Sequence, residues 1–310
     1  MTNTQRHIPV MLNKVLTYLN PEPQKVYVDA TFGFGGYTTA ILQKADCKVI
    51  AIDRDPSVKD RADELKEKYK SRFDFKQGCF SALKELIDTP VDGIVFDIGV
   101  SSMQLDDASR GFSFSKEARL DMRMSSSGLS AYDIVNTYPE DKLADILYRF
   151  GEEKKSRQIA QKIIQARALK PIETTTQLAE LIYQVIYKRP NTIDPATRSF
   201  QALRIAVNEE LAELEKGLKA ATDLLKPQGR LVVVDFHSLE DRIVKNFFKT
   251  NSAPKVHVSK YASKTLNETG KAFSFISPAI TPDEQETISN PRARSAKLRY
   301  AIKDKGEKND

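Results

Sequence analysis

The sequence has no long apolar run, no set of paired cysteines and few histidines. None of its apolar stretches approaches the roughly 18 residues that a membrane-spanning helix needs, so we predict no membrane partner. The first residues, MTNTQRHIPVM, lack the apolar core and cleavage site of a secretory signal. Cys47 and Cys79 form no disulfide framework, which indicates a reducing compartment. His7, His237 and His257 lie far apart and lack the spacing of zinc ligands, so we predict no metal.

The net charge of +6 is modest and unevenly distributed. Residues 251–310 carry eleven Lys and Arg against seven Asp and Glu, so most of the positive excess lies toward the C-terminus. Such an excess favours a polyanionic partner, although a small surplus of lysine is also common in proteins that bind no nucleic acid. Charge alone leaves both interpretations open.

Short apolar runs alternate with helix-like stretches between residues 26 and 97. The helix-like stretches are Tyr37 to Lys44, Ser57 to Tyr69 and Ser81 to Leu86, and the strand-like runs are VYVDA, KVIAID, the weaker RFDFKQ and DGIVFDIG. Runs that are apolar on both faces are typical of strands buried in a parallel sheet. The succession therefore predicts an α/β fold with right-handed crossovers.

The next strand-like run, RLVVVDF at 230–236, follows only after about 130 residues, far more than one βα connection needs. The gap is mostly helical in pattern, with Thr174, Thr175 or Thr176 available to cap one helix. We predict a long helix from about 197 to 225 that returns the chain to the sheet. Beyond the fifth strand we expect a mobile loop at 250–271 and a last strand within AKLRYAIK.

A glycine turn, Gly33-Phe34-Gly35-Gly36, joins the first strand to the helix after it. A Walker A loop is excluded, because no lysine is present to reach a β- or γ-phosphate. A dinucleotide fingerprint requires a third glycine at the position of Thr38. S-adenosylmethionine has no phosphate and needs glycines only where the backbone passes close to its amino acid part. A plain turn is the alternative.

Acids end the two strands beside this turn. Asp29 ends the first strand, and Asp53 ends the second, where its carboxylate can accept hydrogen bonds from both hydroxyls of a ribose. Asp53 can equally cap the next helix, although Asp55, with Pro56 at the first helical position, fits that role better. Asp29, the glycines and Asp53 in consecutive βα units favour a methyltransferase.

The third and fourth strands contribute further candidates. Gly78 and Phe80 follow the third strand, where the ring of Phe80 either flanks an adenine or packs in the core. Asp97 ends the fourth strand, and ligands of open α/β sheets bind beyond the carboxyl ends of the strands. Asp97 is therefore the residue nearest to the expected chemistry.

The stretch Asp97-Ile98-Gly99 occupies the place where methyltransferases of exocyclic base amines put acceptors for the amino hydrogens. Such an amine is a poor nucleophile, because its lone pair is delocalised into the ring. Acceptors favour a more tetrahedral nitrogen, and alignment of the methyl group with that nitrogen can contribute about 7 to 11 kcal/mol. The stretch lacks the Asp-Pro-Pro-Tyr motif of DNA enzymes. Asp97 is our candidate catalytic residue, with a cofactor contact as its alternative.

Longer motifs extend from His7 to about Ala301. They are HIPVM, DATFGFGGYTTAIL, AIDRDP, DIGVSSMQLDDASRGFSF, LDMRM, FGEEK, FQALRIAVNEEL, FHSLEDRIVK and NPRARSAKLR. Together they resemble the ribosomal RNA small subunit methyltransferase H family, also called MraW. FHSLEDR and QLDDASRGFSF are long and specific to that family.

The resemblance implies a class I, Rossmann-like methyltransferase whose mostly parallel sheet carries a helical domain inserted between the fourth and fifth strands. It implies N4-methylation of a cytidine in the decoding region of small-subunit (16S-type) ribosomal RNA, with S-adenosyl-L-methionine as donor and the small subunit as partner. A stacked cytosine is inaccessible, so an unpaired nucleotide is expected. Carried over by motif, the cofactor contacts are Gly35, Gly36, Tyr37, Asp53, Phe80, Asp97 and Gln104.

We expect residues 1–104 and 197–310 to form the S-adenosylmethionine-binding domain, and residues 105–196 to form the inserted helical substrate-recognition domain. Four residues depart from the family pattern: Tyr37, Arg119, Phe150 and Asp235 stand where histidine, proline, tyrosine and serine are usual. A main-chain contact at Tyr37 would survive its change, and the other departures concern the substrate side.

Several polar residues remain open between two roles. We expect four residues after the fifth strand to lie near the pocket rim: His237, Ser238, Glu240 and Asp241. Ser238 either contacts the base or caps the next helix, with Asp241 three residues on. Arginines and lysines are phosphate contacts or are solvated and paired. These basic residues are Arg110, Arg123, Arg292, Arg294, Lys297 and Arg299.

Two other functions compete with rRNA methylation. One is a methyltransferase that acts on DNA, a protein or a small molecule. The other is a Rossmann-like module that binds rRNA as an assembly factor without catalysis, which the departures at Tyr37, Arg119 and Asp235 keep open. Cytoplasm is the expected location, with the mitochondrial matrix as the alternative, because the motifs resemble those of organellar homologues too.

Overall fold

The computed structural model describes residues 9–125, 127–190, 192–252 and 271–305. The chain forms two compact units, the first from Met1–Gly99 and Leu211–Asp310, and the second from Val100–Glu210. These boundaries differ from the expected ones at 104/105 and 196/197. Val100 packs against the core of the second unit, and the helix at 196–208 has apolar side chains within that core.

The first unit is built on a seven-stranded sheet in the order β3-β2-β1-β4-β5-β7-β6. Neighbours from β3 to β5 are parallel, and β7 pairs antiparallel with both β5 and β6. The strands are β1 (Val26–Asp29), β2 (Lys48–Asp53), β3 (Phe73–Gln77), β4 (Val91–Asp97), β5 (Leu225–Asp235), β6 (Phe273–Ile276) and β7 (Lys297–Lys303). The predicted fold class, with an insertion between the fourth and fifth strands, is confirmed.

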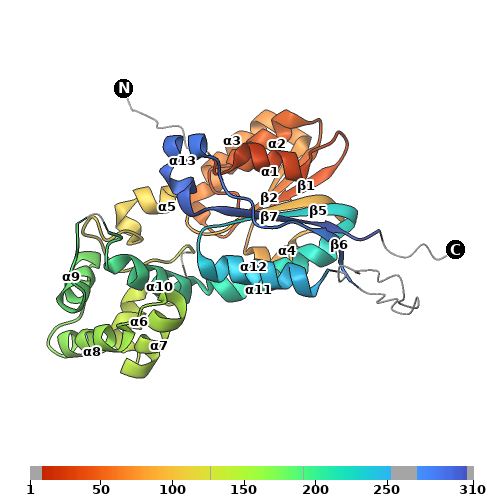
Figure 1. Ribbon diagram of the computed structural model, residues 1–310. Helices are drawn as coiled ribbons and strands as arrows, with labels where there is room; N and C mark the ends of the chain where they lie inside the picture. Colours follow the sequence, from red (N-terminus) through yellow and green to blue (C-terminus); the bar gives the residue numbers. More distant parts are fainter. Residues whose placement is uncertain (1–8, 126, 191, 253–270, 306–310) are drawn as a thin grey trace, which may run out of the picture. The chain divides into compact units, whose positions relative to one another are not determined.

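Helices cover both faces of this sheet (Figure 1). In β2, Val49 and Ala51 face one apolar core, and the alternate residues Ile50 and Ile52 face the other. The helices of the first core are α1 (Leu12–Leu19), α2 (Gly36–Lys44) and α3 (Lys59–Tyr69), and those of the second are α4 (Leu83–Leu86), α11 (Glu210–Leu224) and α12 (Ser238–Thr250). A short helix, α13 (Glu284–Ser289), precedes β7. Burial on both faces explains why the parallel strands are apolar throughout.

The second unit consists of helices around a core of its own. They are α5 (Ser102–Asp106), α6 (Ala131–Thr137), α7 (Glu140–Gly151), α8 (Ser156–Arg167), α9 (Thr175–Val185) and α10 (Ala196–Asn208). Capping boxes start three of them, at Ser101, Ser130 and Thr174. Each box satisfies backbone N–H groups that the first turn of a helix leaves without partners. Of the three possible threonine caps of α9, Thr174 is the one used.

The predicted helix from 197 to 225 is two helices. The chain breaks at Glu209, whose φ of 51° is left-handed, and α10 and α11 lie on either side of it. Asn208 is buried at the break, where its amide donates to the Met122 carbonyl and accepts from the Met124 N–H, both at 2.8 Å. These long-range bonds are invisible to helical periodicity.

Other parts of the chain differ less from expectation. No sequence pattern predicted α1, α13 or β6, and β5 begins at Leu225, before the predicted start of the fifth strand. The last strand predicted within AKLRYAIK is β7. Residues 253–270 of the expected mobile loop lie outside the described residues, as do His7 and His257. Within the described part of the chain, no helix is both long and apolar enough to cross a membrane.

Candidate active site at the carboxyl edge of the sheet

Four parallel strands end in aspartate at the same edge of the sheet. Asp29 ends β1, Asp53 ends β2, Asp97 ends β4 and Asp235 ends β5. The register places Asp29 beside Val95 of β4, two residues before Asp97. The sequence predicted the first three acids as site residues, and ligands of open α/β sheets bind at this edge.

The glycine turn after β1 can be built only with glycine at two positions. Gly33 and Gly35 have φ values of 51° and 74°, in the left-handed region that L side chains avoid. A Cβ at Gly35 would lie 2.8 Å from Cε2 of Phe32 and 2.9 Å from Cδ1 of Leu65. Gly36 begins α2, and a Cβ there would collide with the ring of Pro9. Close packing therefore fixes the path of the turn.

Asp29 ties this turn to the strand. Its buried carboxylate accepts hydrogen bonds from the Thr38 hydroxyl at 2.7 Å and the Thr38 N–H at 3.1 Å, and one from the Thr31 N–H at 3.3 Å. Burial raises the pKa of Asp29 to about 6. Within the described residues, the N–H groups of Gly36 and Tyr37 meet no such acceptor, so this helix end can bind an anionic or carbonyl oxygen.

Asp53 holds the far side of the turn. One carboxylate oxygen accepts from the Gly33 N–H at 2.7 Å, and the other accepts from the Asp55 N–H at 2.9 Å. Burial raises the pKa of Asp53 to about 6. Each carboxylate oxygen has more than one lone pair, so both can still accept a bond from a diol. The helix cap at this place is Asp55, which accepts from the Ser57 N–H at 3.0 Å.

The Tyr37 side chain is bound within the protein. Its ring is buried, and its hydroxyl donates to the carbonyl of Val10. Burial, together with the nearby carboxylates of Asp97 and Asp29, raises the pKa of Tyr37 well above its usual value. A cofactor contact by Tyr37 stays a prediction. The side chain fastens the segment before α1 to the start of α2.

Phe80 follows β3 and is half-buried. Its ring packs edge-on against Phe96 at 5.4 Å between ring centroids. It also covers Gly217 of α11, where a Cβ would lie 2.6 Å from Cδ2 of Phe80. One side of the Phe80 ring therefore packs in the core. The ring is partly exposed, and its role as a flank for adenine stays a prediction.

Asp97 is the least satisfied of the predicted site residues. Its N–H donates to the Thr31 hydroxyl at 2.6 Å, but its buried Oδ1 has no hydrogen-bond partner among the residues that the structure describes. Burial, together with the nearby carboxylates of Asp29 and Glu240, raises the pKa of Asp97 to about 8. A buried polar atom without a partner is rare and costly, so Asp97 is prepared for a ligand that donates a hydrogen bond.

Asp235 is a further buried acid that the sequence marked only as a departure. The residue is 1% exposed, and within the described part of the chain neither carboxylate oxygen has a hydrogen-bond partner. Lys297 and Arg299 of β7 both bind Asp241 instead, at 2.9 and 2.8 Å. Burial and the carboxylates of Glu240 and Asp241 raise the pKa of Asp235 to about 8. Its position at a strand end, like those of Asp29, Asp53 and Asp97, was the available signal.

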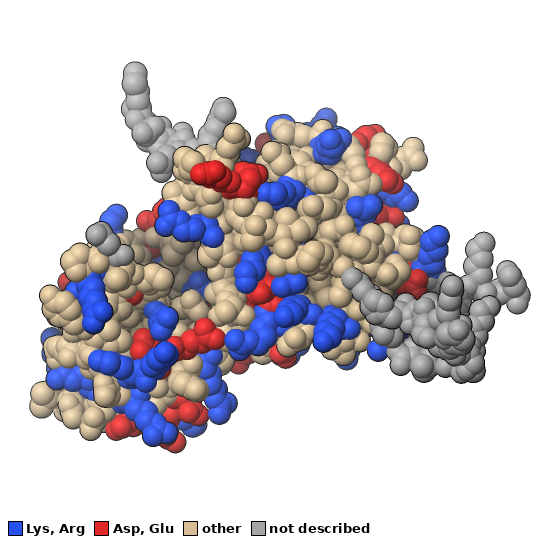
Figure 2. Space-filling view, viewed as in Figure 1, with Lys and Arg blue, Asp and Glu red and all other residues tan. Residues whose placement is uncertain are grey.

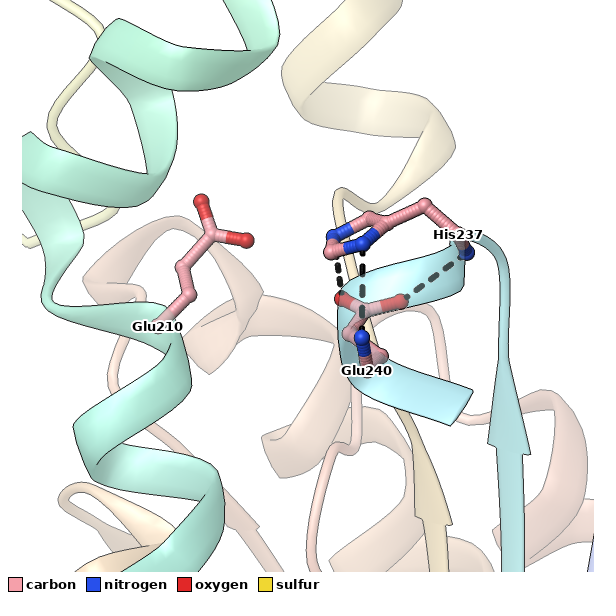
Figure 3. A group of neighbouring side chains, drawn as sticks. All are labelled: Glu210, His237 and Glu240. Carbon is pink, nitrogen blue, oxygen red and sulfur yellow. Dashed lines mark hydrogen bonds and ion pairs between the residues drawn. The ribbon is translucent and has the colours of Figure 1, made fainter. Parts of the chain in front are cut away.

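His237 and Glu240 form the cap of α12 (Figure 3). Glu240 accepts from the His237 N–H at 3.3 Å, and Nδ1 of His237 accepts from the Glu240 N–H at 3.4 Å. His237 Nε2 lies 3.0 Å from the second carboxylate oxygen of Glu240. The capping alternative for Ser238 is therefore wrong, because His237 occupies the cap.

Glu210, also drawn in Figure 3, is the last residue of the second unit. Arg204 donates to both of its carboxylate oxygens at 2.8 Å. The absence of a metal stays a prediction.

Gln104 lies in the second unit and is buried. Its side-chain oxygen accepts from the Ser101 N–H at 3.0 Å, and the Ser101 hydroxyl accepts from the Gln104 N–H at 3.3 Å. This capping box starts α5. The role of Gln104 as a cofactor contact stays a prediction.

Several of the basic residues proposed for phosphate have partners within the chain. Arg110 donates to the carbonyls of Arg123 and Met124, and Arg123 forms an ion pair with Asp121 at 2.7 Å. Lys297 and Arg299 are bound to Asp241 as described above. The pairing alternative therefore holds for these four, and both alternatives stay open for the exposed Arg292 and Arg294.

The parallel sheet, the glycine turn after its first strand and the acids at its carboxyl edge are those of a methyltransferase. The model of the MraW methylase family matches residues 4–304. The chain therefore belongs to the MraW methylase family, whose members use S-adenosyl-L-methionine, and the predicted family, enzyme class and methyl donor are confirmed.

Individual relatives are similar over nearly the whole chain. Ribosomal RNA small subunit methyltransferase H of Rickettsia bellii is 50% identical over 305 residues, covering 96% of this chain and 99% of the relative. The protein of the same name from Rhodospirillum rubrum is 50% identical over 302 residues, covering 94% and 93%. Among solved structures, a putative methyltransferase from Streptococcus mutans aligns over 96% of this chain and 99% of that chain, with 12% identity and a TM-score of 0.44.

Proposed function

We propose that the protein transfers a methyl group from S-adenosyl-L-methionine to N4 of a cytidine in the decoding region of small-subunit ribosomal RNA. The relatives named above support the choice of rRNA. The observation that carries the choice of an amine is Asp97, whose buried Oδ1 lacks a partner at the end of β4. We infer that the protein acts in the cytoplasm on an unpaired nucleotide, with the small subunit as its partner.

The residues at the edge fit the donor. Asp53 would accept the two ribose hydroxyls, because both of its oxygens keep a lone pair after binding the Gly33 and Asp55 N–H groups. The N–H groups of Gly36 and Tyr37 at the start of α2 would bind the carboxylate of the amino acid part. Phe80 would flank the adenine, and Gln104 would be a further contact. When bound, the donor supplies an electrophilic methyl group on a positively charged sulfur.

Asp97 would act on the amine. Its free Oδ1 accepts one amino hydrogen, which reduces delocalisation of the nitrogen lone pair into the ring and orients that lone pair toward the methyl carbon. As the N–C bond forms and the S–C bond breaks, the nitrogen loses a proton, and a carboxylate at this place can accept it. The positive charge of the donor would favour the ionised form of Asp97, against the burial that raises its pKa to about 8.

The second unit would recognise the substrate. Its helices form a core of their own, so their exposed faces are available for binding RNA.

The test uses small ribosomal subunits from a bacterial strain that lacks this methyltransferase. The full chain is incubated with them and with methyl-labelled donor, and the rRNA is then digested to nucleosides for mass spectrometry. We expect labelled N4-methylcytidine at a single site. Label in another nucleoside, in ribosomal protein or in added DNA would support the rival methyltransferases, and donor binding without any product would support an assembly factor.

A further inference from the structure

A cavity of about 660 Å³ lies within the second unit, between the C-terminal half of α7 and the beginning of α8. Four of its lining residues are cationic, and one is acidic, Asp145. The cationic residues are Arg149, Lys154, Lys155 and Arg157. We call this cavity the α7–α8 groove. A hollow with this charge balance fits an anionic ligand.

The fold explains why these cations point outward. Leu143 and Leu147 of α7 are buried in the core, so Arg149 lies on the opposite, exposed face. The helix ends at Gly151, where a Cβ would lie 2.6 Å from the Arg198 carbonyl oxygen, and Glu152 then turns the chain in the left-handed region. The tight turn brings the exposed Lys154 directly beside the end of α7.

The cations have few competing partners. Lys154 and Arg157 are exposed, and neither has an ion pair or hydrogen bond within the part of the chain that the structure describes. Lys155 donates to the Val185 carbonyl at 3.0 Å, and Arg149 lies 3.6 Å from Asp145 in an exposed pair. Exposed pairs of this kind contribute little to stability, so these side chains can turn to a phosphate.

An aromatic side chain completes the groove. Tyr148 lines it and is 62% exposed, which is unusual for a large ring on a helix whose inner face is fully packed. Exposed rings beside cations are typical of surfaces that bind unpaired nucleic acid, because any base can stack on the ring while the cations neutralise the backbone. An acidic protein would use the cations but would have no need of the ring.

We propose that the α7–α8 groove binds a single-stranded segment of RNA, with Lys154 and Arg157 on its phosphates and a base stacked on Tyr148. Lysines and arginines of the second unit are visible as blue side chains over its face in Figure 2. The proposal deepens the proposed function, on which it rests for the identity of the RNA as ribosomal. The groove would be a second RNA contact, separate from the contact with the nucleotide that is methylated.

The experiment measures binding of the full chain to a fluorescein-labelled single-stranded RNA oligonucleotide by anisotropy. The test variant is Lys154→Glu with Arg157→Glu. The matched control is Lys170→Glu with Arg189→Glu, which changes the same two residue types at exposed positions of the same unit outside the groove. We expect the groove variant to weaken binding by about tenfold or more, and to reduce the salt slope by roughly 1.4, for two lost phosphate contacts. Equal loss in both variants would overturn the proposal.

Tyr148 separates RNA from an acidic protein. Tyr148→Ala should weaken RNA binding by at least about fivefold, whereas Tyr148→Phe should restore it, because stacking needs the ring and not the hydroxyl. Binding of labelled polyglutamate as tight as that of RNA, and unaffected by Tyr148→Ala, would overturn the RNA assignment in favour of an acidic protein.

A second readout separates this proposal from the proposed function. In the methylation assay, the groove variant should raise the KM for the subunit while leaving the Kd for S-adenosylmethionine unchanged. If the wild type makes no methylcytidine but RNA binding still depends on the groove, the proposed function fails and the groove stands. If methylation occurs but the groove variant has the KM and the RNA affinity of the wild type, the groove proposal is wrong and the proposed function is supported.

Discussion

The two units of this protein differ in where their ionisable side chains lie. At the edge of the sheet in the first unit, carboxyl groups are buried, and Asp97 and Asp235 have oxygens that no described residue binds by a hydrogen bond. In the second unit, cations are exposed around a groove, and Lys154 and Arg157 have no protein partner among the described residues. The first unit buries carboxyl groups at the edge of its sheet, and the second unit exposes cations around its groove.

This difference corresponds to two kinds of ligand. A buried carboxyl discriminates strongly, because a ligand that fails to donate leaves it unsatisfied, and it suits a small cofactor and one reacting amine. Exposed cations bind a polyanion through many weak and adjustable contacts. The comparison leads to four predictions, in order of decreasing effect.

The largest effect should follow the loss of the acceptor at the end of β4. Asp97→Asn keeps the shape but removes the proton acceptor, so we expect the single-turnover rate of methylation to fall by about 10² to 10³-fold. The Kd for S-adenosylmethionine, measured by calorimetry, should change by much less. A loss confined to donor affinity, with a normal rate at saturation, would instead make Asp97 a cofactor contact.

The next effect concerns Asp53, a second carboxylate of the edge. Asp53→Ala removes the acceptor for the ribose hydroxyls and the bond to the Gly33 N–H, so donor affinity should fall by about 30-fold or more, at about 1 to 1.5 kcal/mol for each bond. Calorimetry measures the change. Asp74→Ala, at a half-buried acid near the start of β3, is the control and should leave the Kd unaltered. Equal affinity in wild type and Asp53→Ala would exclude Asp53 from the site.

A third prediction concerns stability and pH. The pKa of Asp235 is about 8 in the folded protein, and its ordinary value is 3.8, so the folded state holds a proton that the unfolded state releases between these values. The free energy of unfolding should therefore decrease as pH rises from about 4 to about 8, and this contribution should be constant above that range. The groups that face Asp235 are Glu240 and Asp241 of α12 and Lys297 and Arg299 of β7.

Asp235→Asn tests that contribution. The variant has no proton to lose, so denaturant unfolding at pH 5 and pH 8.5 should show a smaller loss of stability with pH than in the wild type, by about one to a few kcal/mol. Other raised acids, such as Asp97, remain in both proteins and cancel in the comparison. Parallel pH profiles would show that Asp235 ionises normally and has partners in solution.

The smallest effect lies in the second unit. Ser130 caps α6 and exchanges hydrogen bonds with Asp133. Ser130→Ala should lower the free energy of unfolding by about 1 kcal/mol, which corresponds to a fall in Tm of about 2 to 4 °C. Ser127→Ala, at an exposed position, should leave the Tm unchanged. A fall in donor affinity in Ser130→Ala would show that the two units do not act separately.

The sequence predicted the first unit better than the second. Strands buried on both faces produce unbroken apolar runs, and an acid or glycine directly after such a run marks the ligand edge, so Asp29, Asp53 and Asp97 could be found. Helical periodicity in the second unit gave segments but missed the break at Glu209, because that break depends on Asn208 bonds to residues more than 80 positions away.

Two features of the site itself could not be foreseen. The Tyr37 hydroxyl donates a hydrogen bond to the Val10 carbonyl, and this bond depends on how the segment before α1 folds. The isolation of Asp235 depends on Asp241, which takes both nearby cations of β7. Both are consequences of tertiary contacts that leave no local pattern in the sequence.

The most direct test of the account is a crystal structure of the full chain with S-adenosylmethionine and cytidine bound. The account predicts ribose hydroxyls on Asp53, the sulfonium methyl facing the cytidine amine, and Oδ1 of Asp97 within hydrogen-bond distance of that amine. An adenosyl group bound anywhere other than the carboxyl edge of β1, β2 and β4, or an amine remote from Asp97, would contradict it.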